Sequence, residues 1–116
     1  MRIEKITTDK KRFLELLLLG DEQEDMIDRY LERGDLFALF DPDLKSLCVV
    51  TDEGKGTCEL KNLATCARSQ GQGYATRLLE HVFRHYSGKY ETILAGTGEE
   101  PRILAFYERR GFIFSH

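Results

Sequence analysis

Apolar and polar positions alternate along this 116-residue chain with a period of two in some segments and near 3.6 in others. Arg2–Ile6 alternates charged and apolar side chains, as a half-buried strand does. A helix is expected to start at Asp9-Lys10-Lys11, and a second to run from Glu22 to Glu32 with Gly34 as its C-terminal stop. Their apolar positions recur at helical spacing and are Phe13, Leu14, Leu17 and Leu18 in the first helix and Met26, Ile27, Tyr30 and Leu31 in the second.

The middle of the chain predicts three consecutive strands joined by tight turns. Leu36–Phe40 and Leu44–Thr51 are connected by Asp41-Pro42-Asp43, in which proline fixes one backbone dihedral. The tetrad Asp52-Glu53-Gly54-Lys55 is expected to form the next turn, and Thr57–Thr65 the third strand. The first two strands therefore form a hairpin.

A glycine-rich segment, Arg68–Ala75, follows and leads into a helix that Ser87-Gly88 ends. One face of this helix is apolar and consists of Ala75, Leu78, Leu79, Val82 and Phe83. A strand is expected at Tyr90–Ala95, a helix from Pro101 to Arg110 that Gly111 closes, and a last strand at Phe112–Phe114. Because hairpin strands precede a strand–helix–strand crossover, we expect an α/β fold with a mixed sheet and helices on both faces.

Length and composition limit the classes of protein to which the chain can belong. Apolar residues make up 41%, charged residues 32%, and the formal net charge is −3, as in ordinary globular proteins. We expect one domain, residues 1–116, and no nucleic-acid partner. The longest apolar run, Leu16–Leu19, is too short to span a bilayer, and the first residues lack the apolar core of a signal peptide, so no membrane partner and a cytoplasmic location are expected.

The cysteines and histidines do not form a recognisable site in the sequence. Cys48, Cys58 and Cys66 are odd in number and widely spaced, which fits neither a disulfide framework nor a zinc site, so three small buried thiols are expected. An alternative for Cys66 is a thiol that can be alkylated beside the glycine-rich segment. His81 and His85 lie four residues apart on the predicted helix, but no third ligand accompanies them, and no metal is expected.

The glycine-rich segment is the strongest candidate for a binding site. Gly71 and Gly73 can adopt backbone conformations that other residues avoid, and the unpaired amides at the start of the next helix can donate hydrogen bonds to an anion. A dinucleotide-binding fingerprint would need a small residue at Thr76, and the Gly-Lys-Ser/Thr of a P-loop is absent. The segment therefore predicts a seat for a diphosphate, and a strand-to-helix turn without a ligand remains the alternative.

Two motifs carry a resemblance to a known family. Arg68, Gly71 and Gly73 fit the order R/Q-x-x-G-x-G/A, which resembles the coenzyme-A-binding segment of the GNAT superfamily of N-acetyltransferases. The segment from Leu104 to Phe112 resembles the A-x-x-F-Y-x-x-x-G-F signature of the same family. The order of predicted elements also agrees, so the resemblance covers nearly the whole chain. It implies a GNAT-like, largely antiparallel central sheet, acetyl-CoA as cofactor, and transfer of an acetyl group to a primary amine by direct attack in a ternary complex.

The resemblance also implies roles for particular residues. The cofactor would be held by the backbone of Leu63, Ala64 and Thr65 and by Arg68, Gln70, Gly71, Gln72, Gly73, Tyr74 and Ala75. Glu59 would accept the proton of the amine, and Tyr107 would donate a proton to the departing thiolate, because a phenol stays protonated at neutral pH. The alternatives are a solvent-facing strand glutamate paired with a lysine, and a half-buried helix tyrosine.

Some positions depart from the family pattern. Glu100 stands where many relatives have an asparagine, for which Thr97 could substitute, and Ala67 stands where a proline is common. The chain also ends at His116, before a further strand that relatives usually have, so we expect either a truncated chain or a homodimer whose second subunit completes the sheet. Two other functions stay open: a catalytically inactive acyl-CoA-binding module, and a regulatory domain that binds a different diphosphate. The acceptor would be a small-molecule or protein amine.

Overall fold

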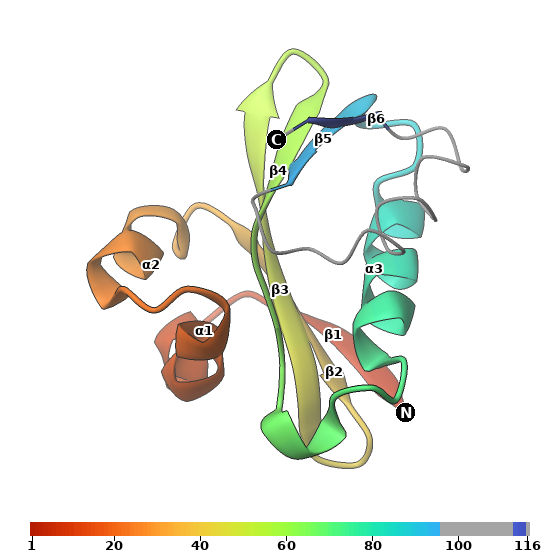
Figure 1. Cartoon of the computed structure of the whole chain (residues 1–116). Coiled ribbons are helices and arrows are strands. Elements are labelled where there is room, and N and C mark those ends of the chain that lie inside the picture. Colours follow the sequence, from red (N-terminus) through yellow and green to blue (C-terminus); the bar gives the residue numbers. More distant parts are fainter. Residues whose placement is uncertain (96–112, 116) are drawn as a thin grey trace.

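The computed structural model describes residues 1–95 and 113–115, and its centre is a six-stranded sheet in the order β1 to β6 (Figure 1). The strands are β1 (Arg2–Ile6), β2 (Asp35–Phe40), β3 (Leu44–Gly54), β4 (Thr57–Thr65), β5 (Thr92–Ala95) and β6 (Ile113–Ser115). The helices are α1 (Leu14–Gly20), α2 (Glu24–Tyr30) and α3 (Tyr74–His85), with short 3-10 helices η1 (Lys10–Phe13) and η2 (Ala67–Ser69). The helix predicted from Pro101 to Arg110 lies outside the described residues.

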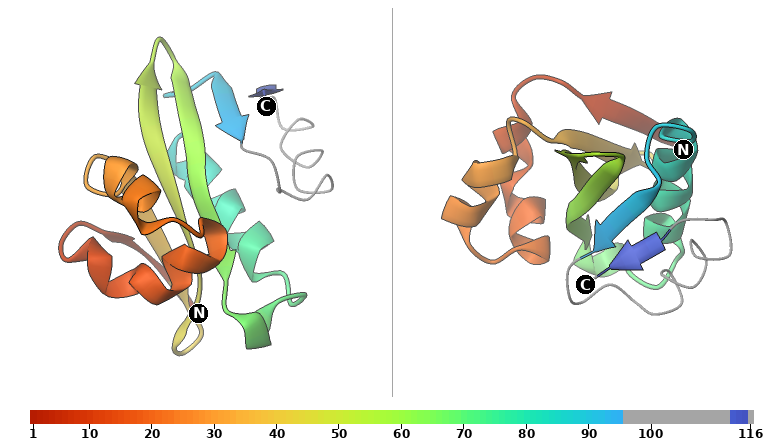
Figure 2. Two further views of the ribbon diagram at one scale, coloured as in Figure 1. Left: turned by 60° about the vertical axis from the view of Figure 1, so that its left-hand side comes forward. Right: turned by 90° about the horizontal axis from the view of Figure 1, so that it is seen from above.

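The sheet is mixed, as the sequence predicts. Strands β1 to β4 pair antiparallel, whereas β4 pairs with β5, and β5 with β6, in parallel. Helices α1 and α2 cover one face and α3 covers the other (Figures 1 and 2). No helix of the described residues is both long and apolar enough to cross a bilayer. The expected α/β architecture with helices on both faces is thus confirmed.

Each face of the sheet has its own apolar core, because alternate strand residues point to opposite sides. Phe37 and Leu39 of β2 pack toward α3. Four residues of its predicted apolar face are buried, Leu78, Leu79, Val82 and Phe83, whereas the fifth, Ala75, is partly buried. Leu36 and Ala38 pack with α1 and α2 on the opposite face. Full burial of side chains of this size contributes about 1.5–3 kcal/mol each, so the two cores are the main source of stability.

The N-terminal helices are shorter than predicted. Asp9 has a left-handed backbone (φ 50°), and the first segment is divided into η1 and α1. This division turns Leu16 into the core beside Leu17, whereas Leu14 and Leu18 are only partly buried. The second helix spans Glu24–Tyr30 instead of Glu22–Glu32, and its Met26 is exposed rather than packed.

Two predicted turn positions are corrected by the structure. Gly34 does not adopt the left-handed conformation of a helix stop; a Cβ at this position would lie 2.7 Å from Val49 Cγ1 and 2.9 Å from the Tyr30 carbonyl oxygen. Its role is therefore to let the chain after α2 approach β3 closely. The turn expected at Asp52–Lys55 lies at Lys55-Gly56, where both residues have positive φ, as two-residue hairpin turns favour.

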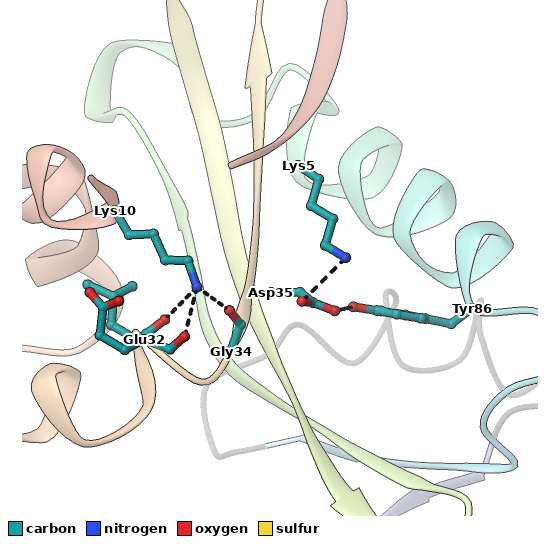
Figure 3. Close-up of polar contacts among 7 residues, drawn as sticks. Lys5, Lys10, Glu32, Gly34, Asp35 and Tyr86 are labelled. Atoms are coloured by element: carbon teal, nitrogen blue, oxygen red, sulfur yellow. Dashed lines mark hydrogen bonds and ion pairs between the residues drawn. The ribbon is translucent and has the colours of Figure 1, made fainter. Parts of the chain in front are cut away.

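Two polar clusters lie on opposite sides of β2 (Figure 3). The buried Lys10 ammonium donates hydrogen bonds to the carbonyl oxygens of Leu31, Glu32 and Gly34 at 3.1, 3.0 and 2.7 Å. It thereby satisfies carbonyl groups that follow α2 and have no hydrogen-bond partner within the helix. On the other side, the Tyr86 hydroxyl donates to Asp35, which also pairs with Lys5 at 3.5 Å. The first cluster joins η1 to the segment between α2 and β2, and the second joins the end of α3 to β2.

Candidate functional site

The β5 side of residues 61–65 of β4, called the open edge below, has no partner strand among the described residues. Strand β5 pairs only with Thr57–Leu60 of β4, whereas β4 continues to Thr65. Within the described residues, no strand pairs with the remaining stretch, 61–65, on the β5 side. Ala95, which pairs with Leu60, is the last residue of β5 that the structure describes.

A β-bulge lies on β4 just beyond Leu60. Val50 pairs with Leu60 and Val49 pairs with Asn62, so Lys61 is an extra residue on β4. A bulge bends its strand and changes which face the following side chains occupy. Leu60 accordingly packs toward α3, whereas Asn62 contacts α1 and α2.

The backbone groups of Leu63, Ala64 and Thr65 do not all face the open edge. The Cys66 amide donates to the Lys45 carbonyl oxygen at 2.8 Å, and hydrogen-bonded pairs alternate in an antiparallel ladder. The polar groups of Ala64 therefore face β3, and those of Leu63 and Thr65 face the open edge. In agreement, the Gln70 side chain donates to the Thr65 carbonyl oxygen at 3.2 Å. Only two of the three predicted backbone positions are thus suited to a ligand at this edge.

The glycine-rich segment forms an open turn at the start of α3. Gly71 and Gly73 have φ of +78° and +86°, and a Cβ on either would meet no atom of the described residues within 4 Å. Gly73 precedes the first helical residue, and no side chain of the described part of the chain caps this helix end. The amides of the first turn, beginning with Tyr74 and Ala75, have no acceptor within the helix. The turn therefore offers amide donors beside open space.

The position at which α3 starts also helps to decide how the glycine motif is aligned with the chain. The order R/Q-x-x-G-x-G/A is met by Arg68, Gly71 and Gly73, but also two residues later by Gln70, Gly73 and Ala75. In the second register, the central glycine is the residue that immediately precedes α3. Sequence reasoning considered only the first register, because the pattern does not show where the helix begins.

The polar side chains of this segment have different environments. Arg68 is exposed, and its carbonyl oxygen accepts a hydrogen bond from Gln72 at 3.4 Å. The Tyr74 hydroxyl donates to Asp41 at 2.9 Å, and this bond, followed by burial, raises the pKa of Tyr74. Tyr74 thus anchors the β2–β3 loop to α3 through its side chain, and only its backbone remains available for a ligand.

Glu59 lies on β4 within the stretch that pairs with β5, opposite Leu94. It pairs with Thr51, and because paired residues share a face, its side chain is on the α1–α2 side of the sheet. Lys61, two positions along the same strand, forms an ion pair with it at 3.0 Å. The alternative expected for Glu59 was a strand glutamate paired with a lysine. Such a lysine is present, and it is Lys61 of the same strand. The side chain is 27% exposed, so its carboxylate remains accessible.

Asn62 is a polar residue of this region that the sequence reasoning missed. It is 2% exposed, and its Nδ2 donates to the Leu17 carbonyl oxygen at 2.9 Å and to the Tyr30 hydroxyl at 3.1 Å. Its Oδ1 is buried without a hydrogen-bond partner among the described residues. The available signal was an asparagine at an alternate position of an otherwise apolar strand face, next to Leu60 and Ala64.

The remaining candidates divide into those that the structure places and those outside it. Tyr107, Thr97 and Glu100 lie outside the described residues. Cys48 and Cys58 are buried, but Cys66 is only partly buried, contrary to expectation; its thiol donates to the Leu44 carbonyl oxygen at 3.3 Å. Cys66 lines a groove of about 490 Å³ together with Arg12, Phe13, Glu15, Leu16, Leu19, Leu44 and Ala67.

The two helical histidines pack against an aromatic ring. His81 and His85 contact Phe37 edge-on, with ring centroids 6.4 and 5.4 Å apart, respectively. Burial lowers the pKa of His81, and the neighbouring His85 adds to the effect. Among the described residues, no group of three or more acidic, histidine or cysteine side chains could hold a metal ion.

Comparisons with known proteins agree with this geometry. A family model described as an acetyltransferase (GNAT) domain matches residues 37–114. The chain is 30% identical over 115 residues to the uncharacterized N-acetyltransferase YvbK of Bacillus subtilis (strain 168), covering 97% of this chain and 74% of that protein. Its fold is similar to a GNAT family acetyltransferase of Elizabethkingia anophelis with acetyl-CoA bound (TM-score 0.78, 27% identity, 94% of this chain and 72% of that chain). It is also similar to a Bacillus subtilis acetyltransferase in complex with CoA (TM-score 0.76, 29% identity, 95% and 74%).

Proposed function

This chain belongs to the GNAT acetyltransferase family, and on that premise we propose that it transfers an acetyl group from acetyl-CoA to a primary amine. The observation that carries the proposal is the glycine turn before α3, where Gly71 and Gly73 have positive φ and no described side chain caps the helix start. Two similar acetyltransferases were solved with acetyl-CoA or CoA bound. We expect the same cofactor here.

The residues present fit such a cofactor. The amides that follow Gly73 would hold the diphosphate, which gains about 0.3–1 kcal/mol per charge from the helix dipole in addition to the amide hydrogen bonds. Because Gly71 and Gly73 have no Cβ, the space beside them is free for phosphate oxygens. Leu63 and Thr65 would bind the amide groups of the pantetheine arm through their backbone, after the Gln70 side chain releases the Thr65 carbonyl oxygen. We assign the diphosphate to the second register of the motif, Gln70, Gly73 and Ala75, in which Gly73 is the central glycine.

Glu59 is the proposed general base. Acetyl-CoA supplies an acyl group activated as a thioester, and the amine must lose a proton to attack it. The carboxylate of Glu59 accepts this proton directly or through a water molecule, and a base in such a position contributes about 10²–10⁴-fold to the rate. Lys61, 3.0 Å away, fixes the carboxylate on the α1–α2 side of β4. The amine would then attack the thioester while both substrates are bound to the protein.

Tyr107 is proposed as the acid, from the motif of Phe106, Tyr107, Gly111 and Phe112 alone. Its hydroxyl would protonate the departing thiolate, because a phenol with a pKa near 10 keeps its proton at neutral pH yet can donate a hydrogen bond to a developing anion. Replacing Tyr107 with Phe removes this donor and keeps the ring. We expect the turnover number to fall, with cofactor affinity unchanged.

Calorimetry and a thiol-release assay test the proposal together. Calorimetry should show that coenzyme A binds, whereas ATP and NAD, which also carry a diphosphate, bind at least about tenfold more weakly, a difference of about 1.4 kcal/mol. Release of free thiol from acetyl-CoA should then depend on an added primary amine. Equal binding of the three compounds would contradict the cofactor assignment, and amine-independent release would contradict transfer.

A further inference from the structure

The glycine-rich segment is attached at both of its ends to the turn of the β2–β3 hairpin, residues 41–45, called the hairpin end below. Where the segment begins, the Cys66 amide donates to the Lys45 carbonyl oxygen at 2.8 Å. Where it ends, the Tyr74 hydroxyl donates to Asp41 Oδ2 at 2.9 Å. Figures 1 and 2 show η2 and the hairpin end at the same end of the sheet. The hairpin end therefore holds both the start and the finish of the proposed diphosphate seat.

The two attachments differ in kind. The bond of the Cys66 amide continues the backbone pairing of β3 with β4 and depends on no side chain. The second attachment depends on two side chains, those of Tyr74 and Asp41. Between the two attachments lie Gly71 and Gly73, and glycine leaves the backbone more freedom than any other residue does. The position of the first turn of α3 relative to the rest of the segment therefore depends on how Tyr74 is held.

Tyr74 is held by its ring and by its hydroxyl. The ring packs against the apolar core between the sheet and α3, and the hydroxyl is bound by Asp41. Asp41 is itself fixed by two further contacts. Its amide donates to the Asp43 carbonyl oxygen at 2.7 Å, and its Oδ1 lies 3.8 Å from the amino nitrogen of Met1. The first residue of α3 is thus bound to an acceptor that has a fixed position.

The charge of Asp41 opposes the binding of a diphosphate. A carboxylate repels an anion, and salt only partly screens charges that lie within about 10 Å of each other. Lys45, the basic residue of the hairpin end, forms an ion pair with Asp43 at 3.1 Å. Any benefit of Asp41 to cofactor binding must therefore come from its geometry and not from its charge.

We propose that Asp41 is a positioning residue of the diphosphate seat, which acts through the Tyr74 hydroxyl to hold the first amides of α3 in the orientation that the ligand requires. The inference rests on the proposed function. A seat whose amides are already oriented in the free protein binds its ligand more tightly, because less conformational entropy is lost on binding. In this role Asp41 contacts neither the diphosphate nor the reacting atoms. The hairpin end thus contributes to cofactor affinity without touching the cofactor.

Calorimetry with coenzyme A tests this role. Tyr74→Phe keeps the packed ring and removes the donor, and Asp41→Ala removes the acceptor. Each should raise the coenzyme A Kd about three- to tenfold, the range for one net hydrogen bond. Asp41→Asn keeps an acceptor oxygen and loses the unfavourable charge, so its Kd should lie within about twofold of the wild-type value. The double variant of Asp41→Ala and Tyr74→Phe should bind no more weakly than the weaker single variant, because both substitutions remove the same bond.

Asp43→Ala is the matched control. It removes the same charge from an exposed position of the hairpin end and keeps the carbonyl group that binds the Asp41 amide, so the coenzyme A Kd should change less than about twofold. The fitted number of sites separates positioning from a merely structural role. Unfolded protein lowers the number of sites per chain, whereas a misplaced seat raises Kd at an unchanged number of sites. An unchanged Kd in Tyr74→Phe, a loss of affinity in Asp41→Asn as large as in Asp41→Ala, or an equal effect of Asp43→Ala would overturn the proposal. So would single effects that multiply in the double variant.

Failure of this inference is distinguishable from failure of the proposed function. If coenzyme A does not bind to the wild-type protein, the proposed function itself is contradicted, and this inference with it. If coenzyme A binds and its affinity depends on Gly73, but not on the Tyr74 hydroxyl or on Asp41, only the positioning role is overturned.

Discussion

Replacing Gly73 with Ala separates a role in cofactor binding from a role in the backbone. Gly73 has φ +86°, and Gly88, beyond the end of α3, has φ +83°. Within the described part of the chain, a Cβ on either residue would meet no atom within 4 Å. The two substitutions therefore introduce the same methyl group into the same backbone conformation, and only one of them lies at the proposed diphosphate seat.

The expected cost to stability follows from the backbone alone. A left-handed conformation costs an alanine about 1–2 kcal/mol, and the open space adds no steric penalty at either position. Both variants should thus lose about 1–2 kcal/mol of unfolding free energy, which lowers Tm by about 4 °C or more in a domain of this size. Equal losses would establish that Gly88→Ala is a valid control.

The effect on the cofactor should differ between the variants. In Gly73→Ala, the added methyl group occupies space that phosphate oxygens need beside the first amides of α3. We expect the coenzyme A Kd, measured by calorimetry, to rise at least about tenfold, equivalent to about 1.4 kcal/mol. Gly88→Ala should leave it within about twofold, because the methyl group there projects into open space away from the seat. Unchanged affinity in Gly73→Ala would refute the assignment of the diphosphate to this turn.

Three further outcomes are expected. Glu59→Gln should lower the turnover number about 10²–10⁴-fold with little change in cofactor affinity. Glu53→Gln alters a glutamate of β3 and should leave the turnover number unchanged. Equal rates for the two variants in a thiol-release assay would exclude Glu59 as the base. Gly20→Ala should lower the unfolding free energy by about 1–3 kcal/mol, because its methyl group overlaps the Asn62 amide oxygen, and urea unfolding without this loss would contradict the contact. The pKa of Tyr30 is about 12 in the fold against 10.0 ordinarily, so its contribution to stability is present below pH 10 and lost between pH 10 and 12. Tyr30→Phe should reduce this alkaline loss of unfolding free energy, measured by urea titration at several pH values. An unchanged loss would count against the buried hydroxyl.

Local patterns predicted much of the fold. The strand predicted at Thr57–Thr65 has these bounds in the structure, and Arg2–Ile6 does as well. The apolar face of α3 is buried where the helical period places it, because packing against the sheet and the 3.6-residue repeat agree. The mixed sheet with helices on both faces followed from hairpin strands that precede a strand–helix–strand crossover, which leave few topologies.

The bulge in β4 could not be predicted from the sequence. Cys58, Leu60, Asn62 and Ala64 occupy alternate positions and suggest one continuous face. In the structure, Cys58 and Leu60 pack toward α3, whereas Asn62 and Ala64 face α1 and α2. The extra residue at Lys61 changes the face without disturbing the pattern, since period-two alternation carries no information on strand pairing. The position of Asn62 on the α1–α2 side depends on this bulge.

The candidate site was predicted in outline but not in detail. The glycine turn and the strand before it were found from composition and spacing. The assignment of Leu63 and Thr65, but not Ala64, to the open edge required the register with β3. The contact of Gly20 with Asn62 joins residues that are far apart in the sequence, and no local pattern indicates it.

Titration of the isotopically labelled protein with coenzyme A, followed through backbone amide NMR signals, tests the central claim most directly. The account predicts the largest shifts at Gly73, Tyr74 and Ala75, with a second group at Leu63 and Thr65 on the open edge of β4. Ala64, whose amide faces β3, should shift less than its two neighbours. Shifts confined to other regions, with the signals of the α3 start unchanged, would contradict the account.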